Sequence, residues 1–98
     1  HVIRLIRRRT GQSVVINQDV FRIGSAGEYV DFYIADNPAI GGWHADITAV
    51  DGNWYIMDRN SANHTYVNGV MAQPMQAVRL QNGEVITLAD EDFEFIIS

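Results

Sequence analysis

The chain has 98 residues and a formal net charge of −5 at pH 7, with 47% hydrophobic and 19% charged residues. Such a length and composition are typical of one folded domain with a modest core, and they exclude a disordered segment. The absence of cysteine excludes disulfides and thiolate metal sites. No apolar run approaches the roughly 18 residues that a membrane span needs, so we expect no membrane insertion of this segment. Because residue 1 is histidine rather than methionine, we expect residues 1–98 to be a single domain from a larger protein.

The cations are concentrated at the N-terminus. All seven are arginine, and the first ten residues carry +4, whereas the other 88, with three arginines and twelve carboxylates, carry −9. A basic segment such as "RLIRRR" is compatible with nucleic-acid binding. However, its apolar residues interleave with the arginines, which favours a strand with one wet face, and the acidic remainder would repel a phosphate backbone. We therefore expect no nucleic-acid partner.

Short apolar-polar runs predict β-strands from the start of the chain. Residues 2–9 and 13–16 form the first two, with Thr10-Gly11 between them. "ADITAV" (45–50) and "NWYIMD" (53–58) alternate more clearly, and Trp54 and Ile56 share one face of the second run. Between these two runs lies Asp51-Gly52, a dipeptide that readily adopts a tight hairpin turn.

The second half of the chain continues the pattern. Asn68-Gly69 separates "TYV" from "VMA", Asn82-Gly83 precedes "EVITL", and Asp90–Asp92 separates that run from "FEFII". No window carries an apolar stripe of helical period, and β-branched and aromatic residues fill the runs. Roughly nine to eleven short strands with closely spaced turns predict an all-β sandwich.

Four segments, in order, resemble the forkhead-associated (FHA) domain, a β-sandwich family that typically reads phosphothreonine peptides. They are "FRIG" (21–24), "VDFYIADNPAIGGWHADI" (30–47), "DRNSANHTYVNG" (58–69) and "VRLQNGEVITLADEDFEFII" (78–97). The second segment is similar to the stretch that ends in the family's Ser-Arg-x-His signature, and the third to its Asp-x-x-Ser-x-Asn-Gly-Thr-x-x-Asn-Gly signature. The resemblance implies an FHA-like sandwich of two mostly antiparallel sheets, a non-catalytic protein-binding role in signalling, no cofactor and a cytoplasmic setting.

The residues that the resemblance assigns to phosphate recognition are substituted in this chain. The family's arginine after the glycine of "IG" falls at Ser25, and its phosphate-binding serine falls at Gly41. The basic or polar residue that follows falls at Gly42, and the residue before the signature asparagine, often threonine, is Ala62. A phosphate dianion needs charge-assisted hydrogen bonds, each worth about 1.5–3 kcal/mol. Losing two or three would remove roughly 3–8 kcal/mol, so we expect no phosphothreonine binding in the family's way.

The framework residues of the resemblance are retained. Asn63, which in the family holds the backbone of the ligand peptide, is present, although the glycine that follows it is replaced by His64. The resemblance assigns structural roles to Gly24, His44, Asp58, Ser61, Thr65, Asn68 and Gly69.

Other cations or amides could replace the missing phosphate ligands. Arg59 lies in the same loop as Asn63, and Arg22 lies near Ser25 in sequence, but we interpret both as solvated or salt-bridged surface arginines. Gly41 and Gly42 could form a nest of backbone amides that cradles an anion. We favour the simpler interpretation that they permit positive φ angles.

His44 could be a catalytic base, a metal ligand or a structural post. No second histidine stands at metal-ligand spacing, and Ser61, Asp58 and His44 lack a nucleophile elbow. The resemblance implies that His44 hydrogen-bonds across the loops and fixes their shape. We expect the hydroxyls of Ser61 and Thr65 to bond to nearby backbone, as short hydroxyl side chains often do.

The sequence therefore predicts a non-catalytic FHA-type interaction module that binds a protein or peptide independently of phosphorylation. Its loops would present Trp43, Asn63, His64 and Tyr66 to the partner. Whether Trp43 is exposed as an anchor or packs against the neighbouring strand stays open. Two alternatives also stay open: an authentic phosphothreonine reader with relocated cations, and a purely structural domain that packs against its own chain or an identical copy.

Overall fold

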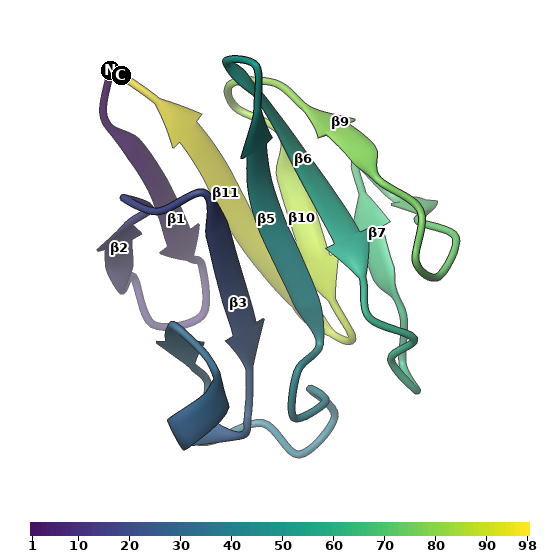
Figure 1. The fold of residues 1–98 in the computed structure, drawn as a ribbon. Coiled ribbons are helices and arrows are strands. Elements are labelled where there is room, and N and C mark those ends of the chain that lie inside the picture. Colours follow the sequence, from purple (N-terminus) through teal and green to yellow (C-terminus); the bar gives the residue numbers. More distant parts are fainter.

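The computed structural model describes residues 1–98 as a sandwich of two β-sheets (Figure 1). The first sheet has the strand order β2-β1-β11-β10-β7-β8 and the second has the order β4-β3-β5-β6-β9. Neighbouring strands are antiparallel except for β3 and β4, which are parallel. The predicted all-β sandwich is confirmed. The strands are β1 Ile3–Arg7, β2 Ser13–Val15, β3 Val20–Gly24, β4 Phe32–Tyr33, β5 Ala45–Val50, β6 Asn53–Asp58, β7 Thr65–Val67, β8 Val70–Met71, β9 Val78–Leu80, β10 Val85–Leu88 and β11 Glu91–Ile97.

The one helical element is the short 3₁₀ turn η1, Gly27–Tyr29. No helix of this chain has the length and apolar character to cross a bilayer.

The predicted hairpin turns lie where expected. Asp51-Gly52 joins β5 to β6 with φ angles of 51° and 78°, and Asn68-Gly69 joins β7 to β8 with φ angles of 48° and 80°. Two consecutive positive φ angles are typical of the tight turns that match strand twist. The turn predicted over Asp90–Asp92 was placed too late, because β11 already begins at Glu91. The Glu91 side chain is buried and forms an ion pair with Arg7 of β1, which holds Glu91 in the sheet.

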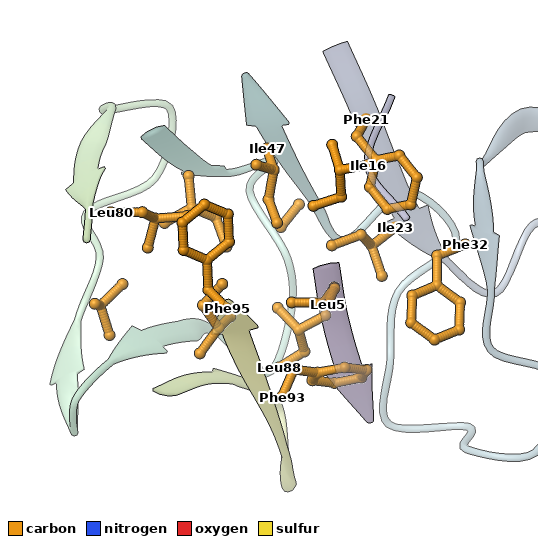
Figure 2. Packing of buried hydrophobic residues seen from close by; sticks show 14 of the residues in the cluster. Leu5, Ile16, Phe21, Ile23, Phe32, Ile47, Leu80, Leu88, Phe93 and Phe95 are labelled. Atoms are coloured by element: carbon orange, nitrogen blue, oxygen red, sulfur yellow. The ribbon is translucent and has the colours of Figure 1, made fainter. Parts of the chain in front are cut away.

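Alternating residues from both sheets form one core, which Figure 2 shows between the layers. The rings of Phe32 and Phe93 meet edge to face with centroids 5.9 Å apart, a favourable aromatic geometry. Trp54 packs against this core beside Phe95, and Ile56 is fully buried, so the prediction that these two residues share one face of β6 is confirmed.

Strand β1 departs from the expected separation of apolar and charged residues. Ile3 and Leu5 point into the core as expected, but Arg7 lies on the same face and is only 4% exposed. Arg7 tolerates this position because the Glu91 carboxylate accepts two hydrogen bonds from its guanidinium, at 2.6 and 2.7 Å. A buried ion pair thus joins the first strand to the last.

The two termini lie side by side at one end of the sandwich (Figure 1). The Val2 amide donates to the carbonyl of Ser98 at 2.7 Å, and the Ser98 amide donates to the carbonyl of Val2 at 2.9 Å. At the opposite end, β3 and β6 finish and β5 starts (Figure 1). We call this end, formed by the loops 25–31, 34–44 and 59–64, the loop end.

Candidate functional site

A close backbone contact joins the first two loops of the loop end. The Ser25 amide donates to the carbonyl of Gly41, and the Ala26 amide donates to the carbonyl of Gly42, both at 3.0 Å. A Cβ atom on Gly24 would lie only 2.1 Å from the Gly42 carbonyl oxygen. Glycine at position 24 is therefore required, and the contact places Ser25 beside the Gly41-Gly42 segment.

His44 braces the second loop against the third. Its Nδ1 accepts a hydrogen bond from the Gly41 amide at 2.9 Å, and its Nε2 lies 2.8 Å from the carbonyl oxygen of His64. Because Nδ1 must accept and Nε2 must donate, the ring is neutral with its proton on Nε2. Burial lowers the pKa of His44, which favours this uncharged form.

Asp58 organises the third loop from its buried position at the end of β6. Its carboxylate accepts hydrogen bonds from the hydroxyls of Ser61 at 2.5 Å and Thr65 at 2.7 Å, and from the Ser61 amide at 3.1 Å. Burial acts to raise the pKa of Asp58, but these hydrogen bonds outweigh it and lower the pKa. The expectation that the two hydroxyls bond to backbone was wrong, because a buried carboxylate within reach is the stronger acceptor.

Asn63 closes the ring of contacts between the loops. Its side-chain amide donates to the carbonyl of Ala39 at 2.9 Å, although the residue is exposed. The neighbouring Ala62 is also exposed and has no side-chain donor. His64 has a φ angle of 70°, so it occupies the left-handed region at the position where the family pattern has glycine.

A buried network that the sequence analysis missed supports the second loop. The Asn37 side-chain amide donates to Glu91 at 2.8 Å and to Asp90 at 2.7 Å, while Glu91 is paired with Arg7. The carbonyl oxygen of the Asn37 side chain accepts the Ala39 amide at 2.9 Å, and so Asn37 fixes the segment that Asn63 contacts. The available sequence signal was the alternation of β1, which places Arg7 inward with Ile3 and Leu5.

The backbone conformation at positions 41 and 42 does not require glycine. The glycines with positive φ are Gly11, Gly52, Gly69 and Gly83, so the interpretation of Gly41 and Gly42 by positive φ was wrong. A Cβ on Gly41 would lie 3.7 Å from the His44 ring, and one on Gly42 would lie 3.4 Å from the Ala26 Cβ, both ordinary contacts. Nor is the Gly41 amide free for an anion, because it already donates to His44. The close approach in this region constrains Gly24 instead.

Trp43 belongs to the second loop, but its side chain lies over the outer face of the second sheet. Its indole N–H donates to the carboxylate of Asp46, a residue of β5 whose neighbours Ala45 and Ile47 point into the core. The Arg59 guanidinium stacks 4.2 Å from the centre of the Trp43 ring and lies 3.5 Å from Asp46. Trp43 is 39% exposed, so it packs on the sheet and still presents a surface.

Neither arginine considered as a relocated cation contacts the Ser25 and Gly41 region. Arg59 is held by Trp43 and Asp46, and Arg22 forms an ion pair with Asp31 at 3.3 Å. Of the residues predicted to contact a ligand, the structure brings together Ser25, Gly41, Gly42 and Asn63, whereas Trp43 and Arg59 lie together on the outer sheet face. No group of three histidine or carboxylate side chains is arranged to hold a metal ion.

The comparisons with known proteins agree with this architecture. The FHA domain family model matches residues 21–89. EmbR of Mycobacterium tuberculosis, solved in complex with a low affinity phosphopeptide, is 28% identical with a TM-score of 0.89. That match covers 99% of this chain but only 24% of EmbR, so the chain spans about a quarter of that protein.

Two further solved structures resemble the whole chain. The FHA domain of an Arabidopsis thaliana hypothetical protein is 27% identical with a TM-score of 0.89, and the match covers 98% of this chain and 85% of that one. The MEK1 FHA domain in complex with a phosphothreonine peptide of HOP1 is 23% identical with a TM-score of 0.85. That match covers 98% of this chain and 96% of the MEK1 FHA domain chain. Curated protein sequences give no significant match. The chain belongs to the FHA domain family and is a non-catalytic protein-interaction module.

Proposed function

We propose that this FHA domain binds its protein partner through the loop end without requiring phosphothreonine. The proposal rests on the two positions that the resemblance to the family assigns to phosphate binding, which hold Ser25 and Gly41 in this chain. The Ser25 hydroxyl donates to the carbonyl of Ile40 at 3.0 Å, and the Gly41 amide donates to His44. A phosphate arriving here would meet no charged donor at either position.

The other positions do not replace what is missing. Ala62 has no side-chain donor, and the Asn63 amide is bonded to Ala39. Arg59 would have to leave both Trp43 and Asp46 before it could reach a phosphate. Cation–π stacking and a partly buried ion pair both oppose that movement. The loss of two or three charge-assisted bonds, roughly 3–8 kcal/mol, therefore has no visible compensation.

The third loop offers the polar side chains of Asn63 and His64 instead. Asn63 and His64 come from the third loop, with the His64 ring edge-on to Tyr66 at a centroid distance of 6.4 Å. The carbonyl oxygen of the Asn63 side chain has no partner within the chain, so it can accept a hydrogen bond from a peptide amide. An unmodified, uncharged peptide segment fits this surface.

The competing function is a phosphothreonine reader with relocated cations. It is favoured by the structures of EmbR and of the MEK1 FHA domain, both of which contain phosphorylated peptides. To read phosphate, this chain would need Arg59 or Arg22 to give up its present carboxylate partner. The two functions make opposite predictions for matched peptides.

The test is a titration of isotope-labelled domain with paired peptide libraries, one phosphorylated on threonine and one unmodified. We expect amide shifts around residues 25, 41 and 63 with both libraries. Micromolar binding confined to the phosphorylated library would establish the phosphothreonine reader. Binding of neither library would favour a structural or self-associating domain, which light scattering as a function of concentration would reveal.

A restored site provides an independent check. The triple variant Ser25→Arg, Gly41→Ser and Gly42→Arg returns the charged and hydroxyl donors of the family pattern, and the contacts around Gly41 and Gly42 leave room for a Cβ atom at both positions. We expect this variant to gain measurable affinity for phosphothreonine peptides. If it folds and gains none, the assignment of the three loop positions is wrong.

A further inference from the structure

The three arginines outside the first ten residues gather on one surface. Arg22 of β3 lies opposite Asp46 of β5, and Asp46 lies opposite Met57 of β6. Arg79 of β9 lies opposite Tyr55 of β6. These side chains point away from the core, because the residues flanking them in each strand belong to it or pack against it. Arg59 joins them by stacking on Trp43 above Asp46. We call this outer surface of the second sheet the arginine face, made of Arg22, Trp43, Tyr55, Arg59 and Arg79.

The charge of the arginine face is opposite to that of the remaining chain. Its carboxylates are Asp46, which is 5% exposed beneath Trp43, and Asp31, which is paired with Arg22. Arg79 is exposed and has no carboxylate within ion-pair distance. Three arginines and two aspartates give this face +1, so the rest of a chain of −5 carries −6. An acidic group therefore meets less electrostatic repulsion at this face than the net charge of the whole chain would suggest.

The aromatic residues make the same face suitable for protein binding. Tryptophan, tyrosine and arginine are the residue types that dominate the binding energy of protein interfaces. Trp43 is held by its indole hydrogen bond to Asp46 and by the Arg59 guanidinium. A side chain that is already ordered loses little conformational entropy when a partner covers it.

We propose that the arginine face is a docking surface for an acidic segment of a protein partner, distinct from the Ser25, Gly41 and Asn63 region of the loop end. Arg79 supplies the free guanidinium for a carboxylate of that segment, and Trp43 and Tyr55 supply apolar contact. A nucleic acid is a poorer occupant, because a long polyanion would also meet the acidic surface that surrounds this face. The proposal does not depend on whether the loop end reads phosphothreonine.

The experiment uses two short synthetic peptides and one competitor. The first peptide is made of aspartate, glutamate and leucine, and in the second asparagine and glutamine replace the two acidic residues. The competitor is a single-stranded oligonucleotide. We expect the acidic peptide to shift the Trp43 indole signal and the amides of Arg22, Tyr55 and Arg79. The shifts should weaken with added salt, and the amide counterpart should cause none. Arg79→Glu should weaken the binding of the acidic peptide about tenfold.

The matched control is Arg4→Glu, which makes the same charge change on the first sheet, where Arg4 bonds only to the Ser98 hydroxyl. It should leave the affinity for the acidic peptide unchanged. The absence of shifts on the arginine face, equal weakening by both variants, or displacement of the peptide by the oligonucleotide would each overturn the proposal. The triple variant Ser25→Arg, Gly41→Ser and Gly42→Arg should bind the acidic peptide like the wild type. Failure of the proposed loop-end function therefore does not imply failure of the docking surface, and the reverse also holds.

Discussion

The Nε2 atom of His44 lies 2.8 Å from the carbonyl oxygen of His64, so a single buried ring from one loop holds the backbone of another. The same ring accepts the amide of Gly41 through Nδ1. Because the contact is made to a carbonyl, it survives any change of the His64 side chain, whereas it depends entirely on the imidazole of His44. The shape of the loop end therefore depends on this one side chain.

Replacing His44 by alanine should destabilise the domain. The substitution leaves the Gly41 amide and the His64 carbonyl without their partner, and each such loss costs about 1–3 kcal/mol. With the cavity that remains, we expect the free energy of unfolding in urea to fall by roughly 2–5 kcal/mol. The control is His64→Asn, which keeps the backbone carbonyl and a residue tolerant of positive φ. A loss for His44→Ala no larger than that for the control would contradict the bracing role.

The free energy of unfolding of the domain should decrease as the pH is lowered through the range in which His44 takes up a proton. Burial lowers the pKa of His44 below the usual 6.5. Between this lowered pKa and pH 6.5, the unfolded chain therefore binds more protons than the folded one. The contribution is complete above pH 6.5 and is lost as the pH falls from there through the lowered pKa. The variant His44→Gln should lack this slope in urea unfolding measured between about pH 7 and about pH 5. A histidine NMR titration of the wild type provides a second readout, and a pKa for His44 above 6.5 would refute the expectation.

The carboxylates of Glu91 and Asp58 should affect the stability of the domain in a lower pH range than His44 does. The Arg7 guanidinium lowers the pKa of Glu91 below its usual 4.5, and the lowered pKa of Asp58 lies below 3.8. Each contributes stability above its unfolded pKa and loses it as the pH falls through the folded one. Acid unfolding of a His44→Gln variant should therefore still occur below about pH 4.

Breaking the buried pair of Arg7 and Glu91 should be far more costly than breaking an exposed pair. Arg7→Met leaves the buried Glu91 carboxylate with only Arg9, at 3.5 Å, as a cationic partner, and we expect it to remove about 3 kcal/mol of unfolding free energy. Arg8→Met removes pairs with Asp92 and Glu94 that are exposed, and it should cost less than about 1 kcal/mol. The double variant Arg7→Met with Glu91→Leu should recover much of the loss. Similar losses for Arg7→Met and Arg8→Met would show that the buried pair is not a stabilising element.

A methyl group at Gly24 should disrupt the contact between the first two loops. In Gly24→Ala the added Cβ would lie 2.1 Å from a backbone oxygen of Gly42, which cannot move aside as a side chain does. We expect a loss of at least about 2 kcal/mol and shifted amide signals at Ser25 and Gly41. The matched control is Gly27→Ala, whose Cβ would approach only the exposed ring of Tyr33 at 3.3 Å. Unchanged amide signals in Gly24→Ala would disprove this account of the loop contact.

The sequence alone determined the strands and most of the turns. The alternation of β5 and β6 and the Asp51-Gly52 turn between them depend on local rules, because side chains alternate in a strand and this dipeptide favours positive φ. The order of four motifs also identified the family. The residues Ser25 and Gly41, on which the proposed function rests, were assigned to phosphate-binding positions from the sequence resemblance without any structure.

The tertiary structure decided which distant groups meet. Arg7 and Glu91 are 84 residues apart, and their pairing follows from the position of β1 beside β11. The contact of Asn63 with Ala39 and the placement of Trp43 under Arg59 likewise depend on how the loops fold together. The sequence could not show that Gly24, rather than Gly41 or Gly42, carries the steric constraint. Local preferences act between near neighbours in the chain, whereas burial, ion pairing and steric exclusion act through space and become defined only once the two sheets have packed.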